Sequence, residues 1–171
     1  MKKLVCLMIA LLLVCSSALA EDVHGLPSAY DFEPLFENAA ELTGSGHQIT
    51  SKNLTSFEGE IRCTFSVTLS TNVVMNICVL NETQETDEIV ILGGGGDANE
   101  SLSFLNAIGE VLYSTGAISD MQDVGDVLEL LDFFDNLQDG DENSIEINGI
   151  EYGYLVSSAL GCMMFYARIP E

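Results

Sequence analysis

The feature that most constrains this fold is a two-residue alternation of apolar and polar side chains that begins at Ile61. Every second position from there is apolar: Ile61, Cys63, Phe65, Val67 and Leu69. Successive side chains of a β-strand point to opposite faces of the sheet, so this period predicts a strand with one face on a core and the other on solvent. A second apolar run, Val73 to Leu80, follows after a short turn. We expect the two runs to pair as an antiparallel hairpin.

The length of that turn decides whether Cys63 and Cys78 can form a disulfide. A three-residue loop, 70–72, places Cys63 opposite Val79 and makes the cross-strand pairs on that face apolar. A two-residue loop places Cys63 directly opposite Cys78 but sets apolar residues against asparagines. Burial favours the first register, because a one-residue slip moves a whole apolar set off the core. Export favours the second, because cysteines outside the cytoplasm commonly oxidise.

The other periodic patterns extend this hairpin to an α+β fold: an antiparallel sheet of about six to seven strands, with an N-terminal helix and two central helices packed against it. The predicted helices are 31–43 with Asp31 as N-cap, a helix from Ala98 to Gly116 with a capping box of Asp97 and Glu100, and a helix capped by Asp126. The apolar face of the last helix is predicted as Val127, Leu130, Leu131, Phe134 and Leu137. The remaining predicted strands are 48–57, 87–92, 144–147, 150–156 and 160–169.

The first 20 residues have the pattern of a secretory signal peptide. Two lysines precede an apolar run, 4–14, and Ala18 and Ala20 place small side chains before Glu21. The run is shorter than the roughly 20 residues that a membrane-spanning helix needs. We therefore expect cleavage after Ala20, no membrane span and an extracytoplasmic protein.

The mature chain is then expected to consist of a flexible leader, 21–30, and one domain, 31–171. Cys15 offers an alternative, because a lipid attached to this cysteine would tether the chain to a membrane. Val14 stands directly before it, where lipid attachment normally requires a small side chain. Both routes lead out of the cytoplasm.

The acidic charge of the chain narrows its possible partners. The signal peptide contains two of the five Lys and Arg residues, so its removal changes the formal net charge from −22 to −24. The mature chain keeps 27 acids and three basic residues, Lys52, Arg62 and Arg168. Nucleic acids and anionic membranes are excluded, because both are bound through cationic side chains. Such a field favours cationic partners, divalent metal or simple solubility. We expect a secreted, non-enzymatic protein that binds a cationic protein or peptide.

A calcium site is the second hypothesis. In a twelve-residue calcium loop, Asp135, Asp139, Asn143 and Glu146 would occupy ligand positions. Leu137 stands where the third position requires an oxygen ligand, and the segment after the loop has the pattern of a strand rather than a helix. A solvated acidic turn is the alternative interpretation.

A hydrolase of unknown substrate is the third hypothesis. The chain has two histidines, His24 and His47, and Cys162 with His47 could supply a thiol nucleophile and a base. Cys63, Cys78, Cys162 and His47 also have the right atoms for zinc, but no two of these ligands have the close spacing that is typical of zinc sites. Aromatic and sulfur-containing side chains gather in the last two strands, where they form either core or a binding face. These residues are Tyr152, Tyr154, Met163, Met164, Phe165 and Tyr166.

Signal-peptide cleavage is tested by the mass of the exported protein. We expect a chain that begins at Glu21, and we expect Ala20→Arg to leave the precursor uncut, because the cleavage site requires a small residue there. Intact-mass spectrometry of the exported fraction measures both. A chain that begins at Cys15 and carries the added mass of acyl groups would contradict this prediction.

Overall fold

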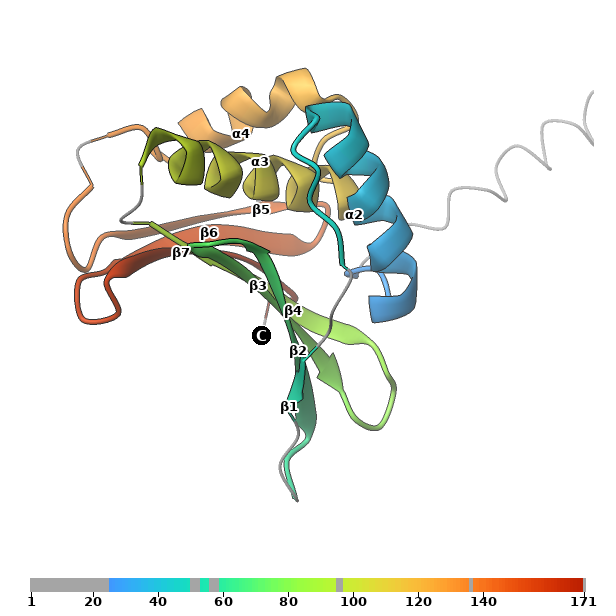
Figure 1. The fold of residues 1–171 in the computed structure, drawn as a ribbon. Helices are drawn as coiled ribbons and strands as arrows, with labels where there is room; N and C mark the ends of the chain where they lie inside the picture. The colour runs from blue at the N-terminus through green and yellow to red at the C-terminus, as the bar shows by residue number, and fades with distance from the viewer. Residues whose placement is uncertain (1–24, 50–52, 56–58, 95–96, 136, 171) are drawn as a thin grey trace, which may run out of the picture.

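The computed structural model describes residues 25–49, 53–55, 59–94, 97–135 and 137–170. Its strands form one antiparallel sheet of seven strands in the order β1-β2-β3-β4-β7-β6-β5. Helices α2, α3 and α4 lie on one side of this sheet (Figure 1). The predicted α+β class is therefore confirmed. The predicted signal peptide, 1–20, lies outside the described residues.

The helical elements are α2 (Ala29–Thr43), α3 (Ala98–Ser114), the 3-10 turn η1 (Met121–Asp123) and α4 (Val124–Leu130). The strands are β1 (Asn53–Thr55), β2 (Arg62–Ser70), β3 (Val73–Leu80), β4 (Thr86–Gly93), β5 (Glu142–Ile147), β6 (Ile150–Ser157) and β7 (Cys162–Arg168). No helix of these described residues is long and apolar enough to cross a membrane.

Helix α2 begins earlier than predicted, because Ser28 rather than Asp31 is its N-cap. The Ser28 hydroxyl accepts the backbone N–H of Asp31 at 3.2 Å and donates to the Asp31 carboxylate at 2.7 Å. The segment predicted as a leader, 21–30, therefore ends in helix. Asp31 takes a place in the first turn, where negative charge is favourable.

The β2–β3 hairpin has the register that burial favours. Cys63 lies opposite Val79, as the three-residue loop requires. The turn itself is different from the prediction, since Ser70 pairs with Val73 and a bulge after Thr68 takes up the extra residue. Cys78 is the neighbour of Val79 along β3, so Cys63 and Cys78 point to opposite faces. The alternative Cys63–Cys78 disulfide is accordingly not formed, and both cysteines are free thiols.

The core lies between the helices and the sheet face that they cover. Phe32 and Phe36 of α2 and Ile108 and Leu112 of α3 are fully buried there. Gly93 lies directly beneath the ring of Phe104, which leaves no room for a side chain at position 93. The sheet contributes a second set of fully buried side chains: Met75, Ile89, Ile91, Tyr152 and Phe165. The aromatic and sulfur-containing side chains of the two C-terminal strands are thus divided between the two faces of the sheet. Met164 and Tyr166 alternate with the buried Phe165 and lie on the opposite, helix-free face.

Helix α3 is positioned by contacts at both ends. Asp97 caps its N-terminus as predicted and accepts the backbone N–H groups of Asn99 and Glu100. The Glu100 carboxylate binds the β2–β3 turn, where it accepts the Ser70 hydroxyl at 2.7 Å and the Asn72 N–H at 3.1 Å. At the other end, the Tyr152 hydroxyl bonds the Thr115 hydroxyl at 2.8 Å. These contacts hold α3 across the sheet.

The last helix is shorter than its apolar pattern predicts. α4 begins at Val124 rather than after Asp126, and it ends at Leu130. Asp132 has a φ of 54°, in the left-handed region, so the residues after it no longer follow a helical period. The predicted apolar face is therefore wrong in part: Phe133 is buried, whereas Leu130 and Phe134 are 66% and 65% exposed.

The buried Tyr152 makes alkaline stability testable. Burial raises the pKa of Tyr152 to about 12, and an unfolded tyrosine titrates near 10. Between these values only the unfolded chain loses the proton. The stabilisation is therefore complete below about pH 10, and it decreases by about 1.4 kcal/mol per pH unit up to about pH 12. Urea unfolding at a series of pH values measures this slope.

The matched variants are Tyr152→Phe and Tyr30→Phe, since Tyr30 is 87% exposed. We expect the first to reduce the slope by about 1.4 kcal/mol per pH unit and the second to leave it unchanged. Equal slopes in both variants would show that Tyr152 is not the group responsible.

Candidate functional site

The longest acidic stretch of the described chain runs from Asp120 to Glu142. It contains nine acids, all exposed, and no Lys or Arg. Three of them, Asp132, Asp135 and Asp141, lie close enough to Tyr154 to raise the pKa of its hydroxyl further, after the larger effect of burial. The stretch therefore folds into a surface of negative potential. We call residues 120–142 the acidic segment.

Two large apolar side chains stand exposed within the acidic segment. Leu130 ends α4, and Phe134 follows in the turn after it, where its ring contacts Phe133 edge to face at 6.1 Å. Phe133 in turn packs edge to face on Tyr154 at 5.4 Å. Phe134 thus lies against a buried aromatic pair while most of its own surface faces solvent. This combination of exposed apolar groups and carboxylates suits a ligand that is both cationic and apolar.

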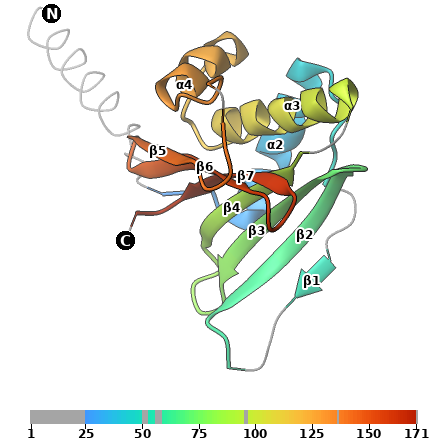
Figure 2. The same ribbon diagram turned by 90° about the vertical axis from the view of Figure 1, so that its left-hand side faces the viewer.

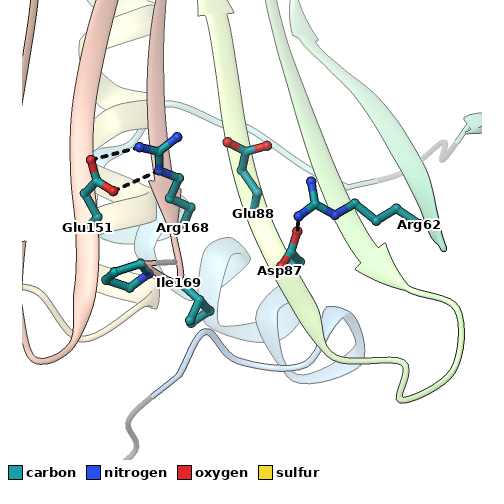
Figure 3. A pocket seen from close by; sticks show the side chains of 7 residues that line it. Arg62, Asp87, Glu88, Glu151, Arg168 and Ile169 are labelled. Carbon is teal, nitrogen blue, oxygen red and sulfur yellow. Dashed lines mark hydrogen bonds and ion pairs between the residues drawn. The ribbon is translucent and has the colours of Figure 1, made fainter.

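The two arginines that the structure describes are already neutralised. On the helix-free face of the sheet, Arg168 binds Glu151 through two nitrogens, at 2.9 and 3.0 Å. Arg62 pairs with Asp87 at 2.6 Å. These residues line a recess of about 450 Å³, with Glu88 between the two guanidinium groups (Figure 3). Neither arginine offsets the charge of the acidic segment.

The sheet register explains how this ionic row is built. Glu88, Arg168 and Glu151 lie directly opposite one another on β4, β7 and β6. The bond to Arg168 lowers the pKa of Glu151, whereas burial raises the pKa of Glu88. The Arg168 guanidinium also lies 4.7 Å from the centre of the Tyr166 ring. Figure 2 shows β7 between β6 and β4 in this sheet.

The residues predicted for calcium are not brought together. Asp139 accepts the backbone N–H of Ser158 at 2.6 Å, which lowers its pKa. The Asn143 amide donates to the Leu131 carbonyl at 3.0 Å. Glu146 lies three positions further along β5 and points to the other face, and Asp135 belongs to the turn after α4. Within the described ranges, no three His, Cys, Asp or Glu side chains are grouped to hold a metal ion.

His47 lies in the loop that joins α2 to β1, and both of its ring nitrogens have partners. Nδ1 is 2.6 Å from Oε2 of Glu110, and Nε2 is 2.9 Å from Oγ of Ser103. The Thr43 hydroxyl is 2.6 Å from the other Glu110 oxygen. Glu110 is fully buried, His47 is 6% exposed and Ser103 is half-buried. The result is a continuous hydrogen-bond chain from a buried carboxylate to a partly accessible hydroxyl.

The geometry of α3 brings the two ends of this chain together. Ser103 and Glu110 are seven residues apart, which is close to two helical turns, so they share one face of α3. Helix α2 ends at Gly44, which has a φ of 69°, and the chain then turns so that the His47 ring reaches that face. The predicted pair of Cys162 and His47 is not formed. Both ring nitrogens of His47 are hydrogen-bonded, to Glu110 and to Ser103. Cys162 lies elsewhere, at the β6–β7 hairpin. His24 lies outside the described residues.

Two small recesses flank the His47 side chain. One, of about 220 Å³, is lined by Ser103, Asn99, Leu102 and Asn106. The other, of about 260 Å³, is lined by Glu37, Glu41 and Gln48. Gly44 and His47 border both.

Sequence reasoning missed Ser103 and Glu110, because both lie far from His47 along the chain, 56 and 63 residues away. One signal was present: a glutamate occupies position 110 among the apolar residues of α3, on the side that packs against the core.

Comparison of the chain with protein-family models, with curated proteins and with solved structures finds no match. Function is therefore inferred from the charge and geometry of this chain.

The buried His47–Glu110 pair is expected to be strongly coupled in stability. His47→Ala removes the partner of a buried carboxylate and is expected to lower the free energy of unfolding by about 3 kcal/mol. Glu110→Leu removes that carboxylate, so His47→Ala should be much less harmful in its presence. Urea unfolding of both single variants and the double variant measures the coupling. Effects that add to within about 0.5 kcal/mol would show that the two side chains do not interact.

Proposed function

We propose that this protein is a secreted acidic binding protein whose partner is a cationic protein or peptide, and that the acidic segment 120–142 is the contact surface. The observation that carries the proposal is the presence of exposed Leu130 and Phe134 among nine exposed acids with no basic residue. Solubility alone accounts for the acids. It does not account for two large apolar side chains in solvent among them.

The chemistry of the partner follows from this surface. Carboxylates accelerate the encounter with a cationic chain over a range of about 8 Å at physiological ionic strength. Apolar contact with Phe134 and Leu130 then supplies short-range affinity, because their exposed area leaves water on binding. The partner is therefore a basic segment with apolar side chains between its lysines or arginines. A purely cationic polymer lacks the second contribution.

Location outside the cytoplasm is part of the same proposal. It is supported by the pattern of the first 20 residues. A strongly acidic protein at the cell exterior would meet cationic proteins and peptides there without competition from nucleic acids. A calcium-binding function has no comparable support, because its expected ligands are directed to other partners.

Binding is tested with a fluorescent amphipathic peptide built from lysine and leucine, followed by anisotropy. We expect Phe134→Ala to weaken affinity about tenfold, because burial of this side chain contributes on the order of 1.5 kcal/mol. Leu54→Ala is the matched control, since Leu54 is 59% exposed on β1, at the opposite edge of the sheet from β5. Equal losses in both variants would contradict a specific surface.

The charge contribution is tested with two triple variants that change net charge equally. The first replaces Asp132, Asp135 and Asp141 with Asn, and the second replaces the exposed Glu60, Glu82 and Glu85 with Gln. We expect the first to weaken peptide binding more than the second, and the difference to shrink as salt rises. Equal weakening would mean that the overall charge, and not the acidic segment, attracts the peptide.

A further inference from the structure

We propose that Ser103, His47 and Glu110 form an acyl-transfer site that hydrolyses short-chain carboxylic esters, with preference for a cationic alcohol group. The site is separate from the acidic segment and does not depend on the function proposed above. Ser103 is the nucleophile, His47 the general base and Glu110 the residue that positions the base. The same three roles recur in hydrolases of unrelated folds and are recognised by their geometry.

The hydrogen-bond chain sets the proton positions that this chemistry needs. With Glu110 ionised and His47 neutral, the imidazole proton lies on Nδ1 and is donated to the Glu110 carboxylate, which only accepts hydrogen bonds. Nε2 is then left with a free lone pair and accepts the hydroxyl proton of Ser103 at 2.9 Å. Thr43 holds the second Glu110 oxygen at 2.6 Å and so fixes the carboxylate. The imidazole is thereby held in the tautomer that can take a proton from serine.

The recess beside Ser103 has room and donors for a small acyl group. Asn99 and Asn106 precede and follow Ser103 by four and three residues, so all three lie on one face of α3. All three line the recess of about 220 Å³. Side-chain amides at these positions can donate to the oxygen that becomes negative when the hydroxyl attacks a carbonyl carbon. An acyl group of a few carbons fits a recess of this volume.

The neighbouring recess determines the preference for the alcohol group. Glu37 and Glu41 line it, and Gly44 and His47 separate it from Ser103. Among the residues that the structure describes, no Lys or Arg lines either recess. A cation on the alcohol is therefore attracted where an anion is repelled.

The reaction proceeds in two balanced steps. Ser103 Oγ bonds to the carbonyl carbon while its proton passes to His47 Nε2. The bond to the alcohol oxygen then breaks, and this oxygen leaves with the proton. Water attacks the acyl-serine in the same way, which releases the carboxylic acid and restores the hydroxyl.

Hydrolysis of p-nitrophenyl acetate and labelling with a fluorophosphonate test the site on the whole mature protein. We expect the label on Ser103, located by mass spectrometry of peptides. Ser103→Ala should lower turnover about 100-fold or more, and Ser101→Ala, an exposed serine of the same helix, should leave it unchanged. Absence of label on wild-type Ser103, or equal hydrolysis by Ser103→Ala and wild type, would overturn the proposal whatever the stability of the variants.

Glu110→Gln separates positioning from a merely structural role. Thr43 donates to the carboxylate oxygen that faces away from His47, so it selects the oxygen of a glutamine there and turns the amide nitrogen toward Nδ1. The amide then donates to Nδ1, and the imidazole proton moves to Nε2, which no longer accepts from Ser103. We expect about a 100-fold loss of turnover together with a change of the His47 tautomer in nitrogen-15 NMR, in a protein that still folds. A changed tautomer with unchanged turnover would refute the role of His47 as base.

Acetylcholine and its uncharged dimethylbutyl isostere test the alcohol preference, with acetate release followed by NMR. We expect a higher kcat/KM for the cationic ester, and a ratio reduced about tenfold in Glu37→Gln/Glu41→Gln. Equal kcat/KM values for the two esters would overturn the substrate class and leave the nucleophile to be judged by its own label.

Discussion

Burial of a single face of the sheet is the constraint on which the rest of this structure depends. α2 and α3 cover the face that carries Cys63, Val67, Met75 and Ile77, and the β2–β3 register aligns these side chains. A one-residue slip would exchange them for their polar neighbours. The same alternation leaves the other face for the ionic row of Glu88, Arg168 and Glu151, so one period specifies the core and the charged surface together.

Polar groups on the covered side have to satisfy one another. Glu110 is fully buried on the core-facing side of α3, where an unpaired carboxylate would be strongly destabilising. His47 and Thr43 meet this need, and both belong to the end of α2 and the loop after it. The pair therefore joins α2 to α3 through polar contacts as well as apolar ones. It also fixes the orientation of the imidazole toward Ser103. The hydrogen bonds that stabilise the buried carboxylate therefore also arrange the three side chains of the proposed catalytic site.

The sequence predicts correctly those features that depend on residues close together in the chain. The β2–β3 register and the Asp97 cap follow from side-chain period and from hydrogen bonds between near neighbours. Prediction failed at Ser28 and at Asp132, where one residue decides where a helix begins or ends. Ser103 and Glu110 were missed for another reason: their contacts with His47 exist only after α2 has packed on α3. Periodicity carries no information about such a pairing.

The two proposed activities respond differently to ionic strength. The acidic segment acts through exposed carboxylates, whose attraction for a cationic partner is screened by salt over about 8 Å. The His47–Glu110 bond is buried, so salt has little access to it. Glu37 and Glu41 belong to a surface recess and are screened like the acidic segment. Salt would therefore reduce partner binding and the preference for a cationic ester, while the proton transfer between Ser103 and His47 would persist.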